Sequence, residues 1–127
     1  DLAGKVQDWN IHCTGGMLKP SALAFTGPRA ESMVAAYHVT TAVISCEGID
    51  LADGYTDSRD ENALLKRAMM ASTKRVILAA DSTKFGKVSF ISIGGFSDID
   101  VLVTDFDPGE EWRTMLEENG IELIVAE

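Results

Sequence analysis

Short apolar runs alternate along the chain with stretches of helical period. Residues 40–45 (TTAVIS) form an apolar, β-branched run, which is typical of a strand buried on both faces of a sheet. Residues 75–80 (RVILAA) predict a second buried strand. Further segments are predicted to be extended at residues 10–13, 88–93, 99–104 and 121–125. Strands that alternate with helices in this way predict one α/β domain with a mostly parallel sheet and crossover helices.

Two helices are predicted in the first half of the chain. Pro28 suits the first position of a helix, where its missing N–H breaks no bond. The residues that follow repeat on one helical face: Ala30, Met33, Val34 and Tyr37. Ser58 and Glu61 have the spacing of a capping box ahead of a second helix over residues 61–72.

A third helix is predicted near the end of the chain. Asp107 is placed to cap it, Pro108 to begin it and Gly120 to end it. Its apolar stripe is more typical of core than of a partner surface, and it consists of Trp112, Met115 and Leu116.

Polar residues follow the predicted strands at their carboxyl ends. They are Gly15-Gly16 after the strand at 10–13, Cys46-Glu47-Gly48 after TTAVIS, residues 81–86 after RVILAA, and Asp105 after the strand at 99–104. Ligands of open parallel sheets bind beyond these strand ends, where loops and helix N-termini meet. We therefore expect the functional site at this edge.

Asp81, Ser82 and Lys84 are the most suggestive group at this edge. Lysine contacts phosphate as a flexible point charge, and a carboxylate accepts hydrogen bonds from sugar hydroxyls. The three side chains therefore suit an anionic, polyhydroxylated ligand. The alternative is that Asp81 and Ser82 cap a turn while Lys84 is solvated, since aspartate and serine are common turn residues.

Other polar groups give weaker signals. An acidic cluster is better explained by a solvated loop and a helix N-terminus than by a cation site, because it lacks EF-hand spacing; it comprises Glu47, Asp50, Asp53, Asp57, Asp60 and Glu61. No nucleophile motif accompanies His12 or His38, so no catalytic residue, metal or cofactor is predicted. The pairs Lys66-Arg67 and Lys74-Arg75 are exposed helix charges or face an effector.

Composition limits the class of protein. The chain has 127 residues, 46% of them apolar, and no apolar run long enough to span a bilayer. Its net charge of −9 disfavours direct contact with DNA or anionic lipid. Cys13 and Cys46 fit no zinc spacing, and we expect two reduced, buried thiols of a cytoplasmic protein.

Several motifs together closely resemble the effector-sensing half of DeoR-type bacterial transcriptional regulators. They occur in family order and cover almost the whole chain: TGGMLKP (14–20), TGPRAE (26–31), SCEGIDLADGYTD (45–57), ENALLKRAMM (61–70), ADSTKFG (80–86) and FSDIDVLVTD (96–105). The resemblance implies a fold similar to ribose-5-phosphate isomerase and related transferases. It also implies a phosphorylated sugar as effector, and self-association as a dimer or tetramer.

The same resemblance implies that Asp81, Lys84 and Gly48, and more loosely Glu61 and Lys66, contact the effector. We also expect Glu47, Ser82 and Gly16 at this site, because they follow predicted strands. Lys66 and Arg67 stand near the place where isomerase relatives carry a glutamate base, and a cation cannot serve as that base. We therefore expect a sensor, with a sugar-phosphate isomerase as the alternative.

Two family parts are absent from the printed sequence. One is the helix-turn-helix domain, through which alone DNA would be contacted. The other is a first strand with a Gly-Thr-Thr-type loop that would hold the phosphate, and Asp1 is expected to follow just beyond it.

Overall fold

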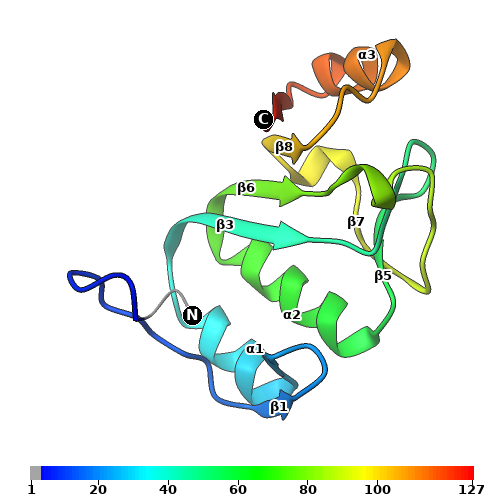
Figure 1. Ribbon diagram of the computed structural model, residues 1–127. Coiled ribbons are helices and arrows are strands. Elements are labelled where there is room, and N and C mark those ends of the chain that lie inside the picture. Colours follow the sequence, from blue (N-terminus) through cyan, green and yellow to red (C-terminus); the bar gives the residue numbers. More distant parts are fainter. Residues whose placement is uncertain (1–3) are drawn as a thin grey trace.

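A four-stranded parallel sheet is the centre of the fold (Figure 1). The computed structural model describes residues 4–127. The strands lie in the order β3, β6, β8 and β9, with bounds Val39–Ser45, Thr73–Ala79, Val101–Thr104 and Glu122–Val125. All neighbouring pairs are parallel. The predicted α/β class with a mostly parallel sheet is confirmed.

The helices that link these strands pack against one face of the sheet. Each successive strand is added on the same side of the last, so right-handed crossovers bring the connections to a common face. The α-helices are α1 (Pro28–Ala35), α2 (Asp60–Ala71) and α3 (Glu110–Glu118). One buried cluster joins sheet and helix residues, among them Ile44, Leu78, Leu102, Ala63 and Leu116. Trp112 and Met115 pack against it, so the predicted core role of the α3 stripe is confirmed.

A small antiparallel sheet packs against α2 and contributes to the same core. It consists of β4 (Gly48–Asp50), β5 (Gly54–Asp57) and β7 (Ile91–Gly94). The extended segment expected at 88–93 is therefore a strand only from Ile91 onward. We predicted neither β4 nor β5, and the chain from β3 to α2 runs through both of them (Figure 1).

A hairpin precedes α1, formed by β1 (Met17–Lys19) and β2 (Ala24–Thr26). The strand predicted at 10–13 is wrong, because those residues form no ladder and Ile11 is 51% exposed. An apolar run becomes a strand only where a neighbouring strand offers its backbone groups, and no described segment does so here. Gly15-Gly16 therefore does not follow a strand.

The prediction that residues 40–45 are buried on both faces was also wrong. β3 lies at the edge of the sheet, and its side chains alternate between a buried and an exposed face. Ile44 is 3% exposed and belongs to the core, whereas Val43 is 60% exposed. β-branched composition alone did not distinguish an edge strand from a central one.

The helix boundaries differ from prediction by one or two residues. α2 begins at Asp60 with Arg59 as N-cap and no side-chain cap, so the Ser58–Glu61 capping box is not formed. α3 begins at Glu110 instead of Pro108, while the Asp107 carboxylate accepts hydrogen bonds from the Gly109 amide and the Arg113 guanidinium.

The predicted end of α3 is confirmed. Gly120 has a positive φ of 67°, a conformation that glycine adopts without strain, and the Ile121 amide donates to the Leu116 carbonyl at 2.8 Å. The chain can thereby turn from the helix into β9.

The two cysteines differ in environment. Cys46 is buried and Cys13 is exposed, so the expectation of two buried thiols is wrong for Cys13; both are free. Across residues 4–127, no helix is long and apolar enough to cross a membrane. The described residues also hold no group of three or more histidine, cysteine, aspartate or glutamate side chains suited to a metal ion.

Candidate functional site

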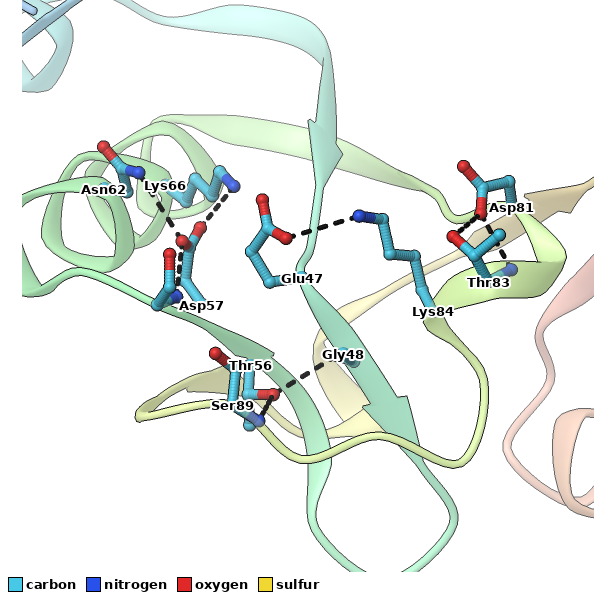
Figure 2. Close-up of polar contacts among 11 residues, drawn as sticks. Glu47, Gly48, Thr56, Asp57, Asn62, Lys66, Asp81, Thr83, Lys84 and Ser89 are labelled. Atoms are coloured by element: carbon cyan, nitrogen blue, oxygen red, sulfur yellow. Dashed lines mark hydrogen bonds and ion pairs between the residues drawn. The ribbon is translucent and has the colours of Figure 1, made fainter. Parts of the chain in front are cut away.

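The ends of β3 and β6 meet at one edge of the parallel sheet. Glu47 follows β3, and Lys84 closes the short 3-10 helix η1 (Ser82–Lys84) that follows β6. The Lys84 Nζ lies 3.3 Å from Glu47 Oε2 (Figure 2). The Ser82 amide donates to Asp105 Oδ1 at 2.7 Å, which joins this loop to the end of β8. The polar residues after three of the four predicted strands therefore do lie together.

A second ion pair lies beside the first and is more buried. Lys66 on α2 places its Nζ 2.5 Å from Asp57 Oδ2, and these side chains are only 18% and 2% exposed. Asp57 Oδ1 accepts the Ser58 amide at 2.8 Å and contacts the Asn62 side-chain amide at 3.5 Å. Each carboxylate oxygen is thus engaged, as a buried charge requires.

The Lys66–Asp57 pair and Glu47 of the other pair line a pocket of about 440 Å³ under the β1–β2 hairpin. This volume is in the range of small-molecule sites. Its polar lining consists of Ser21, Thr26, Ser45, Glu47, Asp57, Asn62 and Lys66. Lys19 of the hairpin pairs with Glu61 of α2 at 3.2 Å, which fastens the hairpin across the pocket.

Cys46 is buried directly after β3 and precedes Glu47 in the chain. Burial raises the pKa of Cys46 to about 11, and the charges of Lys66 and Lys84 both act against that rise. A residue between β3 and the pocket thus lies in the field of two cations at once. In Figure 2, Glu47 lies between Lys66 and Lys84.

Asp81 has a different role from the pocket residues. Its carboxylate accepts hydrogen bonds from the Thr83 amide at 2.8 Å and from the Thr83 hydroxyl, and these bonds lower its pKa. Figure 2 shows dashed lines from one Asp81 carboxylate oxygen to Thr83 and none from Asp81 to Lys84 or Glu47. The geometry corresponds to the turn-capping alternative, with Asp81 and Ser82 shaping the loop that presents Lys84.

Gly48 and Gly16 permit close approaches of the backbone. A Cβ on Gly48 would lie 2.4 Å from the Lys87 carbonyl oxygen, and one on Gly16, whose φ is +125°, would lie 2.6 Å from the Thr26 carbonyl oxygen. Neither glycine lines the pocket beside Lys66. Both act by shaping the surrounding chain.

Glu61 does not line the pocket, but its ion pair with Lys19 attaches the β1–β2 hairpin to α2. Its pKa is lowered by its own backbone N–H and by Lys19. The charged form that binds Lys19 is therefore favoured.

Arg67 faces away from the pocket. Its Nε donates to the Ile93 carbonyl at 3.2 Å, and its guanidinium also bonds the Ser92 carbonyl, so it fixes α2 to β7. Of the Lys66-Arg67 pair, only Lys66 reaches the pocket.

Five polar residues of the pocket were not predicted from the sequence: Ser21, Thr26, Ser45, Asp57 and Asn62. Asp57 was assigned to a solvated acidic loop, which is wrong, because it belongs to the buried strand β5. No periodic signal separates it from the neighbouring exposed acids. Its position in the family-like segment 45–57 was the one available indication.

Comparison with known proteins agrees with the resemblance found in the sequence. Residues 2–106 match the family described as DeoR C terminal sensor domain. The uncharacterized HTH-type transcriptional regulator YulB of Bacillus subtilis is 41% identical over 105 residues, covering 83% of this chain and 40% of that protein. The HTH-type transcriptional repressor GlcR of the same organism is 32% identical over 127 residues, covering 100% and 49%.

The L-fucose operon activator of Haemophilus influenzae is 33% identical over 112 residues, covering 88% of this chain and 45% of that protein. The chain thus spans about half or less of the length of these curated relatives. The match over residues 2–106 includes both ion pairs and the pocket between them. This chain belongs to the DeoR C-terminal sensor domain family.

Proposed function

We propose that this chain is the effector-binding domain of a DeoR-type transcriptional repressor of sugar metabolism, and that a phosphorylated sugar is its effector. The observation that carries the proposal is the pocket lined by Lys66, Asp57 and Glu47. The Glu47 carboxylate brings a second ammonium group, that of Lys84, to the edge of this pocket at 3.3 Å. Ammonium groups suit a phosphate, while carboxylate, amide and hydroxyl groups suit sugar hydroxyls.

The names of two relatives support the regulatory part of the proposal. GlcR is named a transcriptional repressor, and the Haemophilus protein is named for the L-fucose operon. We propose a repressor by analogy with GlcR, and a sugar-derived effector by analogy with the fucose regulator. The effector's phosphate is proposed from the two lysines.

The proposed mechanism is a shift of populations. The effector binds at the strand ends and favours one dimer or tetramer arrangement, which changes the spacing of DNA-binding domains that lie outside this sequence. DNA contact through a separate domain agrees with the net charge of −9. We place the protein in the cytoplasm with its operator and propose no membrane partner.

Calorimetry on the longest natural form of the protein tests this proposal. A panel of sugar phosphates is titrated alongside the same sugars without phosphate, and operator affinity is measured with each compound. We expect at least one sugar phosphate to bind and to change operator affinity, and its unphosphorylated sugar to bind more weakly. If no sugar phosphate binds and operator affinity never responds, the proposal fails.

Lys84→Ala and Lys74→Ala form a matched pair for this experiment. Both remove one lysine charge, but Lys74 is exposed at the opposite end of β6. We expect Lys84→Ala to weaken binding of the sugar phosphate and Lys74→Ala to leave it unchanged. Equal effects of the two substitutions would show that net charge, and not the pocket, governs binding.

A sugar-phosphate isomerase-like enzyme is the second candidate, because Asp57 places a carboxylate in the pocket. Its oxygens are engaged by Lys66, Ser58 and Asn62, which leaves it poorly placed to take a proton from a substrate. Coupled assays with pentose and hexose phosphates distinguish the two functions. Robust turnover that is abolished by Lys84→Ala would overturn the sensor proposal.

A further inference from the structure

Lys66 lines the pocket and Lys84 pairs with Glu47 at its edge, and the two lysines have ion partners of contrasting kinds. Lys66 is 18% exposed and its partner Asp57 only 2%, with 2.5 Å between the charged atoms. Lys84 is 29% exposed and its partner Glu47 is 52% exposed, with 3.3 Å between them. One pair is buried and short, and the other is open to water.

This contrast determines which cation can change partner. Separating a buried pair leaves an uncompensated charge in a low-dielectric site, which is strongly unfavourable. In an exposed pair, the attraction between the two charges is nearly offset by the water that solvates each charge when they separate. Lys84 can therefore release its carboxylate at little cost, while Lys66 cannot.

The Glu47 carboxylate can also leave without moving the backbone. The Glu47 amide donates to the Thr56 carbonyl at 2.9 Å, which ties its main chain to β5. On the other side, the Lys84 amide donates to the Asp81 carbonyl at 3.0 Å. Both main chains are fixed, so an exchange of partners requires only side-chain rotation.

We propose that Glu47 occupies, on Lys84, the position taken by the anionic group of the effector, so that binding exchanges one carboxylate for one phosphate. This inference rests on the proposed function and adds a regulatory role for Glu47. The displaced carboxylate stays at the pocket, where it lines the wall beside Lys66. It is then free to accept hydrogen bonds from hydroxyl groups of the same ligand.

An internal competitor lowers affinity for anions and leaves affinity for neutral sugars unchanged. Exposed ion pairs of this kind correspond to about a 1.4- to 5-fold change in a binding constant. Repulsion between Glu47 and a phosphate acts in the same direction. Glu47 therefore sets the effector concentration at which the domain responds.

Glu47→Gln tests this role because it removes the charge and retains the shape. Inorganic phosphate is titrated calorimetrically into wild-type protein and the variant at constant ionic strength. The titration is repeated with the sugar phosphate that binds wild-type protein best, and with its unphosphorylated sugar. Glu118→Gln is the control, since it removes the same charge from an exposed residue at the end of α3.

We expect Glu47→Gln to tighten both phosphate ligands about threefold and to leave the neutral sugar unchanged. Glu118→Gln should leave all three unchanged. Weaker or unaltered phosphate binding by Glu47→Gln, or equal tightening by Glu118→Gln, would overturn the inference.

The outcomes also separate this inference from the proposed function. If wild-type protein binds a sugar phosphate and Glu47→Gln does not tighten it, the proposed function stands and the exchange is wrong. If neither protein binds any sugar phosphate, both are wrong. Circular dichroism spectra of the variants establish that each is folded before titration.

Discussion

The Lys66–Asp57 pair should contribute strongly to stability, unlike the Lys84–Glu47 pair beside it. Removing one member of a fully buried ion pair costs about 3–5 kcal/mol. Lys66 is 18% exposed, and Asp57 keeps its bonds from Ser58 and Asn62 when Lys66 is lost. We therefore expect Lys66→Met to lower the free energy of unfolding by about 2–3 kcal/mol.

Lys84→Met is the comparison, because it removes the same charge from the exposed pair. It should lower the free energy of unfolding by less than about 1 kcal/mol. Urea unfolding followed by tryptophan fluorescence measures both values at pH 7, because Trp112 packs against the core while Trp9 is already 65% exposed in the folded state.

A double-mutant cycle isolates the pair itself. Asp57→Asn and Lys66→Met are made singly and together, and the coupling energy between them should be about 1–3 kcal/mol. If the coupling is near zero, or Lys66→Met costs no more than Lys84→Met, then burial does not distinguish the two lysines and the reasoning behind the exchange at Lys84 is refuted.

Three further predictions test the packing around the site. Gly48→Ala should destabilise the protein by about 1–3 kcal/mol because its Cβ meets a carbonyl oxygen at 2.4 Å, whereas Gly95→Ala, with nothing within 4 Å, should cost much less in the same urea unfolding. At neutral pH, mass spectrometry should find iodoacetamide on the exposed Cys13 well before the buried Cys46, and equal rates would contradict the structure. Burial raises the pKa of Cys46 from 9.0 to about 11, so its contribution to stability is complete below pH 9 and is lost as the pH rises toward 11. The wild-type protein should therefore lose up to about 2 kcal/mol more than Cys46→Ala over that range, and parallel pH profiles would contradict this cause.

The parallel sheet was predictable because its strands are long or flanked by clear signals. Residues 40–45 and 75–80 are rich in apolar and β-branched residues, and helix α2 between them repeats its apolar residues at helical spacing. The short strands were not predictable. β1 and β4 have three residues each, which is too few to show a period, and their hairpins form through tertiary contacts.

The site was also predictable only in part, because some of its residues are brought together by tertiary packing and not by a local pattern. Glu47 and Lys84 follow neighbouring parallel strands, whose carboxyl ends lie at the same edge of the sheet, so their proximity could be predicted. Asp57 looked like one more acid in a polar loop, because its burial depends on where β5 packs and on which face of α2 Lys66 occupies. The role of Asp81 could not be decided from the sequence, because an aspartate at this position can either contact a ligand or cap a turn.

The separation of Glu47 and Lys84 along the chain has a consequence for how the domain folds. They are 37 residues apart and meet only when β3 and β6 align, with α2 formed between them. Closing a loop of this length loses chain entropy that is recovered only once the strands pair, so such contacts form slowly. The Lys66–Asp57 pair spans only nine residues and can form within the β5–α2 unit. We therefore expect the buried pair to form first during folding, and the Lys84–Glu47 pair only when the sheet is in place.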